Sequence, residues 1–262
     1  MSDSYTSGIQ WDAAPKGREE HIANSKTYVT GSNEDRAIII IHNVAGWTYK
    51  TLRRLADAFA AEVDATVYIP DFRALSFKDA PFPSHELIGE HPTPGKPFDV
   101  MDFMQNNYAA VGQFALANTK DIRRDEIFAV AEAVKAKHKS VGVAGYCWGG
   151  WAAFQLGAND KGLVDCVYVA HPNNLTTEEV DTVGVPVLIH CPETSLDFTP
   201  ELKRHCFETI PARGLAFGYQ HFPGQEYSFA TRGDACVPGE REAMVLAKNA
   251  AVMWFRNWLV VQ

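Results

Sequence analysis

Short apolar runs alternate with stretches of helical periodicity along most of this chain. The runs are rich in β-branched residues, which is typical of strands buried on both faces of a parallel sheet. They occupy residues 37–41, 66–72, 141–144, 166–170, 185–189 and 217–222. The stretches with helical spacing occupy residues 51–62, 121–137, 151–156, 201–209 and 240–259. This alternation predicts a doubly wound, mostly parallel α/β sheet with helices on both faces.

One segment breaks the alternation. Residues 73–118 contain five prolines between positions 81 and 97, together with several aromatic residues. Long connections in compact domains are usually functional, and the aromatic content favours a packed lid, with a short helix over 98–108. We find no internal repeat and no linker, so we expect a single domain over residues 1–262.

Composition and charge narrow the range of partners. The formal charge of the 262 residues is −8, which argues against nucleic acid and anionic membranes as partners. The five cysteines are odd in number, which suits free thiols in a reducing compartment. The chain opens without a basic region followed by an apolar run, so we expect a cytoplasmic protein. A small-molecule substrate is therefore expected, and a homodimer is left open.

The clearest indication of a catalytic residue is the pentapeptide Gly145–Gly149, which has the pattern G-x-C-x-G around Cys147. It lies between a predicted strand and a predicted helix, as in a nucleophile elbow. Glycines two residues before and after would let strand and helix cross closely, and a helix N-terminus favours a thiolate. The alternative is a packing turn of small residues around an inert, buried cysteine.

Polar residues follow several of the predicted strands, at the sheet edge where doubly wound folds bind ligands. These residues are Asn43, Asp71, Cys147, His171, Glu193 and the loop 225–227. The histidines and cysteines show no metal-ligand spacing, and no G-x-G-x-x-G or phosphate loop follows the first strand of the parallel sheet. We therefore expect neither a metal nor a nucleotide cofactor.

The chain resembles the dienelactone hydrolase family, in particular its fungal branch, from about residue 27 to 258. The motifs that carry the resemblance are Ile41–Trp47, Tyr68–Phe72, Gly145–Gly150, Ala170–Pro172, Phe222–Gly224 and Phe229–Asp234. The resemblance implies an α/β-hydrolase fold and a Cys-His-Asp triad that opens lactones and esters. It also implies an oxyanion hole formed by the backbone amides of Val44 and Trp148.

The sequence departs from the family at the triad. The position of the family's histidine holds Tyr227, and the position of its acid holds Ser195, with Asp197 two residues later. Asp197 could recover the acid role through a two-residue bulge. Asn43 stands where many members carry an acidic residue.

Two further residues could supply a base. His171 could replace the missing imidazole, although a structural or pocket role fits its motif better. Glu226 could turn inward, although a solvated loop carboxylate is the simpler interpretation. A tyrosine with a pKa near 10 is a poor base at neutral pH but a good hydrogen-bond donor.

Three functions follow from these residues. The favoured one is an enzyme that acts on a small, largely apolar carbonyl or lactone-type metabolite by isomerisation, cyclisation or loss of a group. Cys147, Tyr227 and Asp197 would be its catalytic residues, and Asn43, Trp47, Phe72, His171 and Glu226 would contact the substrate. The second function is a thiol-dependent hydrolase with a rebuilt base, and the third is a non-catalytic binding protein.

Overall fold

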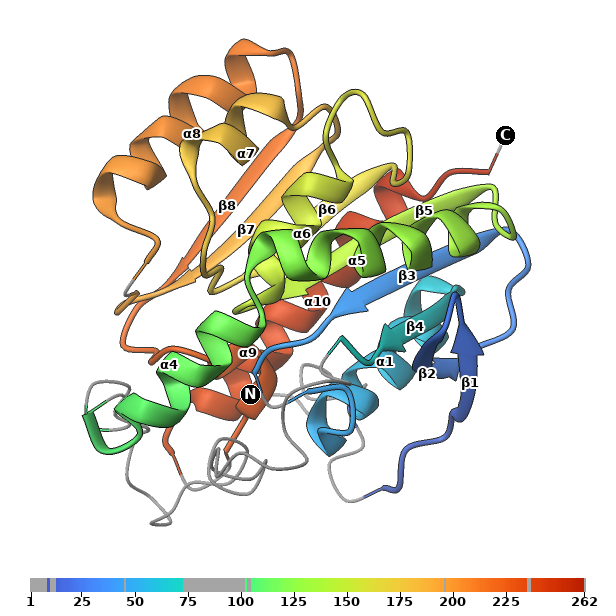
Figure 1. The fold of residues 1–262 in the computed structure, drawn as a ribbon, viewed down its shortest axis with the longest axis horizontal. Coiled ribbons are helices and arrows are strands. Elements are labelled where there is room, and N and C mark those ends of the chain that lie inside the picture. The colour runs from blue at the N-terminus through green and yellow to red at the C-terminus, as the bar shows by residue number, and fades with distance from the viewer. Residues whose placement is uncertain are drawn as a thin grey trace.

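A computed structural model describes residues 9, 13–44, 46–72, 102, 105–195, 197–234 and 237–261. Eight strands form one sheet in the order β1-β2-β4-β3-β5-β6-β7-β8 (Figure 1). The strands are β1 Arg18–Ile22, β2 Ser25–Thr30, β3 Arg36–Ile41, β4 Thr66–Pro70, β5 Ser140–Tyr146, β6 Cys166–Ala170, β7 Val187–Pro192 and β8 Phe217–Phe222. All neighbours from β4 to β8 are parallel, whereas β1 and β2 add an antiparallel hairpin at one edge. The predicted mostly parallel sheet is confirmed.

Helices cover both faces of the sheet. One face packs against α5 (Lys120–Lys135), α6 (Gly149–Leu156), α7 (Thr177–Thr182) and α8 (Pro200–Ala212). The other face packs against α1 (Lys50–Val63), α9 (Phe229–Arg232) and α10 (Glu240–Trp258). Each strand of the sheet centre therefore contributes alternate side chains to two hydrophobic cores, as the continuous apolar runs predicted.

The predicted insertion is only partly described. The helix expected over 98–108 falls largely outside the described residues. The helix that the structure describes in this part of the chain is α4, which runs from Tyr108 to Ala117. A role for residues 73–118 as a lid stays a prediction.

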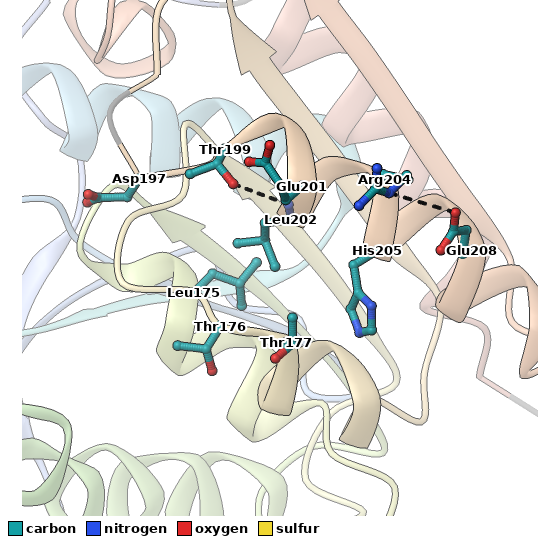
Figure 2. A pocket seen from close by; sticks show the side chains of 10 residues that line it. All are labelled: Leu175, Thr176, Thr177, Asp197, Thr199, Glu201, Leu202, Arg204, His205 and Glu208. Atoms are coloured by element: carbon teal, nitrogen blue, oxygen red, sulfur yellow. Dashed lines mark hydrogen bonds and ion pairs between the residues drawn. The ribbon is translucent and has the colours of Figure 1, made fainter.

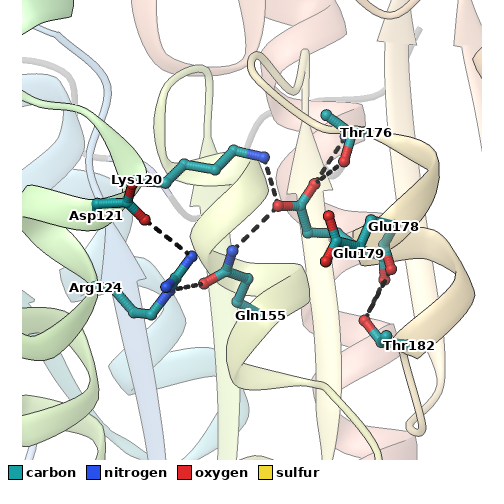
Figure 3. A network of polar contacts seen from close by, with 8 residues as sticks. All are labelled: Lys120, Asp121, Arg124, Gln155, Thr176, Glu178, Glu179 and Thr182. Carbon is teal, nitrogen blue, oxygen red and sulfur yellow. Dashed lines mark hydrogen bonds and ion pairs between the residues drawn. The ribbon is translucent and has the colours of Figure 1, made fainter.

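A polar network ties three helices together on the α5–α8 side (Figure 3). Its centre is Glu179 of α7, which is 5% exposed. The Glu179 carboxylate accepts hydrogen bonds from Lys120 of α5, from Gln155 of α6 (3.1 Å) and from the backbone and side chain of Thr176 (2.9 and 2.6 Å). We call these four residues the Glu179 cluster. Burial pushes the pKa of Glu179 upward, but the hydrogen bonds outweigh it, and its pKa is lowered overall.

None of the helices in the described ranges is long and apolar enough to cross a lipid bilayer.

Candidate functional site

Cys147 follows β5 immediately and takes a left-handed backbone conformation with a φ of 52°. The glycines around it are required by close packing. A Cβ atom on Gly145 would lie 2.5 Å from the Gly149 oxygen, and one on Gly149 would lie 2.3 Å from the Ile41 oxygen. Strand, strained turn and helix thus have the form of a nucleophile elbow, as the pentapeptide predicted.

The Cys147 thiol is 6% exposed and lies at a junction of three loops. Burial is the largest influence on the pKa of Cys147 and raises it from its ordinary value. The nearby Tyr227 hydroxyl and the backbone amides of Trp148 and Val44 oppose this rise, whereas the Asp197 carboxylate adds to it. The strongest influences on this sulfur among the described residues include no imidazole. The thiol is therefore held in its protonated form at neutral pH.

Tyr227 is 6% exposed, and its hydroxyl has no hydrogen-bond partner of good geometry within the described part of the chain. Burial, followed by the neighbouring Cys147 thiol, holds the pKa of Tyr227 well above its ordinary value, while the Asn173 side chain lowers it. Tyr227 thus stays a neutral phenol. Its hydroxyl lies beside the thiol and is available to donate to a bound molecule.

His171 lies directly after β6 and is fully buried, with a ring centroid 5.2 Å from that of Tyr227. Neither of its ring nitrogens has a hydrogen-bond partner among the described residues. Burial lowers the pKa of His171 to about 3, so the imidazole is neutral at pH 7. The structure therefore brings His171 to the site but leaves it without a bond to the thiol.

The segment Phe229–Asp234 anchors two loops of the site. The Asn43 side-chain amide donates to Thr231 Oγ1 (3.1 Å), which holds the loop that carries the Val44 amide. Arg232 donates to the backbone oxygen of Tyr227 (3.1 Å) and forms a buried, bidentate ion pair with Glu240 at 2.8 Å for both bonds. The sequence motif was noticed from its resemblance, but nothing in its spacing revealed this anchoring role.

Asp197 is exposed and reaches the site through Asn173. The Asn173 side-chain amide donates to the Asp197 carboxylate, and the Asn173 backbone amide donates to the Cys147 oxygen (2.9 Å). Ser195 accepts a hydrogen bond from the Phe198 backbone amide (3.3 Å). Asn173 was not identified from the sequence, because its role depends on a contact between two loops.

The remaining predicted residues are distributed around this centre. Phe72 is fully buried in the same core as Cys147, and Trp148 is fixed by a hydrogen bond from its indole to the Asn118 oxygen (3.2 Å). Trp47 lies in the core on the opposite face of the sheet, where the Arg53 guanidinium covers its ring at 4.7 Å. Glu226 is half-buried in the loop before α9. Roles in substrate binding for these residues stay predictions.

A surface cavity of about 450 Å³ lies between the start of α7 and α8 (Figure 2). Asp197 lies at one end of this cavity and Glu208 at the other. The lining residues are Leu175, Thr176, Thr177, Asp197, Thr199, Glu201, Leu202, Arg204, His205 and Glu208. The Asp197 carboxylate is therefore open to solvent ions on this side.

In the described ranges, no group of three or more His, Cys, Asp or Glu residues could hold a metal ion. The assembled groups are instead two backbone amides, a phenol and a thiol, all uncharged at neutral pH. Such groups can polarise a carbonyl and stabilise a developing oxyanion or enolate.

Comparisons with known proteins agree with this geometry. "Hydrolase tropI" of the fungus Talaromyces stipitatus is 26% identical over 259 residues, which cover 96% of this chain and 94% of that protein. The "Carboxymethylenebutenolidase homolog" of Homo sapiens is 24% identical over 93% of this chain and 91% of its own length. The solved structure of a dienelactone hydrolase from Anabaena variabilis superposes with a TM-score of 0.59 at 12% identity, covering 94% of this chain and 98% of that one.

The model of the Dienelactone hydrolase family matches residues 25–259, which is most of the chain. The resemblance noted from the motifs is thereby confirmed, and so is the α/β-hydrolase fold that it implied. Enzymes of this family are hydrolases. From its sheet, its elbow and this match, the chain belongs to the dienelactone hydrolase family.

Proposed function

We propose that this protein acts on a small, largely apolar carbonyl or lactone-type metabolite by chemistry other than hydrolysis. The observation that carries the proposal is the buried Tyr227 hydroxyl, which has no described partner and lies beside a thiol that no described imidazole deprotonates. Isomerisation, ring closure or loss of a group from an activated substrate are the reactions such a site suits.

Each group of the site has a part in this chemistry. The Val44 and Trp148 amides would receive the substrate's carbonyl oxygen as negative charge develops on it. Tyr227 would donate a hydrogen bond to the same oxygen and so share in stabilising its negative charge. Cys147 would contact the reacting carbon as a neutral thiol. Hydrolysis needs a base to activate the thiol or water, and its loss costs about 100- to 10,000-fold in rate.

The direct test combines product mass with site variants. The purified protein is incubated with extracts and with a panel of esters and lactones, and products are identified by mass spectrometry. We expect a product of unchanged mass or a smaller one, lost in both Cys147→Ala and Tyr227→Phe. Robust addition of water that Cys147→Ala abolishes would overturn the proposal. Product formation that survives both variants would favour a binding protein.

A second test restores the family residues. Tyr227→His combined with Ser195→Asp places an imidazole and a carboxylate at the family's triad positions. We expect Cys147 to react with iodoacetamide at pH 7 at least ten times faster than in the unmodified protein, because an adjacent imidazole favours the thiolate. Tyr219→His, on β8, is the matched control and should leave the rate unchanged. Equal rates in both variants would contradict the assignment of position 227.

A thiol-dependent lactone or ester hydrolase is the second candidate. It is favoured by the hydrolase names of the relatives and by the His171 ring, whose nitrogens are both without a described partner next to Tyr227. In that case His171→Asn would abolish water addition, whereas under the first proposal it would leave Cys147 alkylation unchanged.

A further inference from the structure

The loop that follows β6 joins three parts of the candidate site through one residue, Asn173. We propose that Asn173 is a positioning residue: its side-chain amide anchors the Asp197 carboxylate and its backbone amide anchors Cys147, so that the carboxylate is held beside the thiol and the phenol. This inference rests on the proposed function, because it describes how the same site is kept ready.

The geometry gives Asn173 two attachments that act at once. Its backbone N–H donates to the Cys147 oxygen at 2.9 Å, which fixes the loop to the elbow. Its side-chain amide donates to the carboxylate of Asp197, a residue that is otherwise exposed. Among the described contacts, this hydrogen bond is the one that ties the exposed Asp197 carboxylate to the loop bonded to Cys147.

The carboxylate has an effect that differs from that of a triad acid. In a triad, the acid stabilises the protonated imidazole and so helps the nucleophile to ionise. Here the negative charge of Asp197 raises the pKa of both Cys147 and Tyr227. Asp197 therefore favours the neutral thiol and the neutral phenol, which are the hydrogen-bond-donating forms that the proposed chemistry requires.

The other charged and titratable groups around the thiol do not replace this effect. His171 is neutral at pH 7 because burial lowers its pKa to about 3. The Arg232 guanidinium forms a buried ion pair with Glu240 and donates to the backbone oxygen of Tyr227. Among the described residues, Asp197 is the charged group with a marked effect on the pKa of Cys147.

The test is the pH dependence of Cys147 alkylation by iodoacetamide, read at the Cys147 peptide by mass spectrometry. Removing the charge in Asp197→Asn should move the midpoint about half a pH unit lower, which is about threefold in rate below the midpoint. Asn173→Ala should move it in the same direction, because the freed carboxylate turns to solvent. The double variant should match Asp197→Asn alone, since both changes remove the same interaction.

Control variants distinguish a positioning role of Asn173 and Asp197 from a general effect of substitution on folding. Glu201→Gln removes another exposed carboxylate of the same cavity, and Asn159→Ala truncates an exposed asparagine elsewhere; both should leave the midpoint unchanged. The Asp197→Asn shift should shrink in 1 M salt, where charges are screened within about 3 Å. If the buried thiol reacts too slowly, thiolate absorbance at 240 nm, measured against the matching Cys147→Ala protein, gives the same midpoint.

Two outcomes would overturn the inference. One is a shifted midpoint in Asp197→Asn with an unshifted one in Asn173→Ala, and the other is full additivity in the double variant. Neither outcome bears on which product the enzyme forms. Failure of the proposed function would appear in the product masses instead, so the two failures can be told apart.

Discussion

Two buried polar clusters of this protein differ in how fully their polar groups are hydrogen-bonded. In the Glu179 cluster, the carboxylate accepts hydrogen bonds from Lys120, Gln155 and Thr176 (Figure 3). Around Cys147, the Tyr227 hydroxyl and both ring nitrogens of His171 have no hydrogen-bond partner among the described residues. An unsatisfied buried polar group costs about 1–3 kcal/mol of folding free energy.

The difference teaches how to separate structural polar groups from functional ones. A satisfied cluster stabilises the helices that it joins and offers nothing to a ligand. Unsatisfied donors and acceptors lower stability in the free protein, but a bound molecule can satisfy them. The contrast predicts that substitutions in the Glu179 cluster affect mainly the stability of the fold. Substitutions around Cys147 should affect mainly the reaction.

Lowering the pH should produce the largest difference between the two clusters in their effect on the free energy of unfolding. Burial lowers the pKa of His171 and His190 to about 3, so the unfolded chain takes up their protons first as pH falls below 6.5. Stability should then fall by roughly 1.4 kcal/mol per pH unit for each histidine, or roughly 4 kcal/mol for both between pH 6.5 and 5. Glu179, whose pKa is lowered, contributes its loss only below about pH 4.5. Urea unfolding at pH 7 and pH 5 measures the difference.

A histidine variant tests the origin of this pH dependence. His171→Asn keeps a residue that tolerates the left-handed conformation found there and removes one titrating group. The loss between pH 6.5 and 5 should be about halved, by roughly 2 kcal/mol. His21→Asn, at an exposed position, is the control and should leave the loss unchanged. An equal loss in both variants would refute the assignment to buried histidines.

Breaking the satisfied cluster should cost less than the acid effect but leave the site intact. Glu179→Ala leaves Lys120 and Gln155 without their shared acceptor and should destabilise the fold by about 2–3 kcal/mol, because Lys120 is partly exposed and can regain water. The exposed neighbour Glu178→Ala should change stability by less than about 0.5 kcal/mol. Urea unfolding measures both values. A change in the rate of Cys147 alkylation would show that the two clusters are not independent.

Removing an unsatisfied polar group should have the smallest effect on the free energy of unfolding. This change should raise stability, whereas the changes above lower it. Tyr227→Phe deletes a buried hydroxyl that has no described partner, so stability should rise by about 1 kcal/mol while product formation falls. Tyr168→Phe is the matched control, because that hydroxyl bonds to His190 Nδ1 at 3.1 Å and its loss should cost about 1 kcal/mol. Thermal unfolding distinguishes the two. Equal destabilisation would mean that the Tyr227 hydroxyl is already satisfied.

Much of the fold could be predicted because its signals are local. The apolar runs 166–170 and 217–222 coincide with β6 and β8, and the strand-turn-helix pattern placed Cys147 correctly. The strand β1 was missed because its charged residues at the sheet edge carry no apolar alternation. The helices α7 and α9, of six and four residues, are too short to show a helical period.

The site was predictable only in part for a different reason. Cys147 could be predicted from the G-x-C-x-G pattern, and Tyr227 from its place in a motif that carries the family resemblance. The roles of Asn173, Thr231 and Arg232 depend on contacts between loops that are distant in sequence. No local pattern encodes such contacts, so they became visible only when the sheet brought the loops together.

The hydrogen bond between Asn43 and Thr231 joins positions that are 188 residues apart. During synthesis, the loop with the Val44 amide is made early, whereas its anchor emerges near the end of the chain. A chain that stops before residue 231 therefore lacks this anchor, and one that stops before residue 227 also lacks the phenol. The loop that carries the Val44 amide can therefore be anchored in this way only after residue 231 has been made.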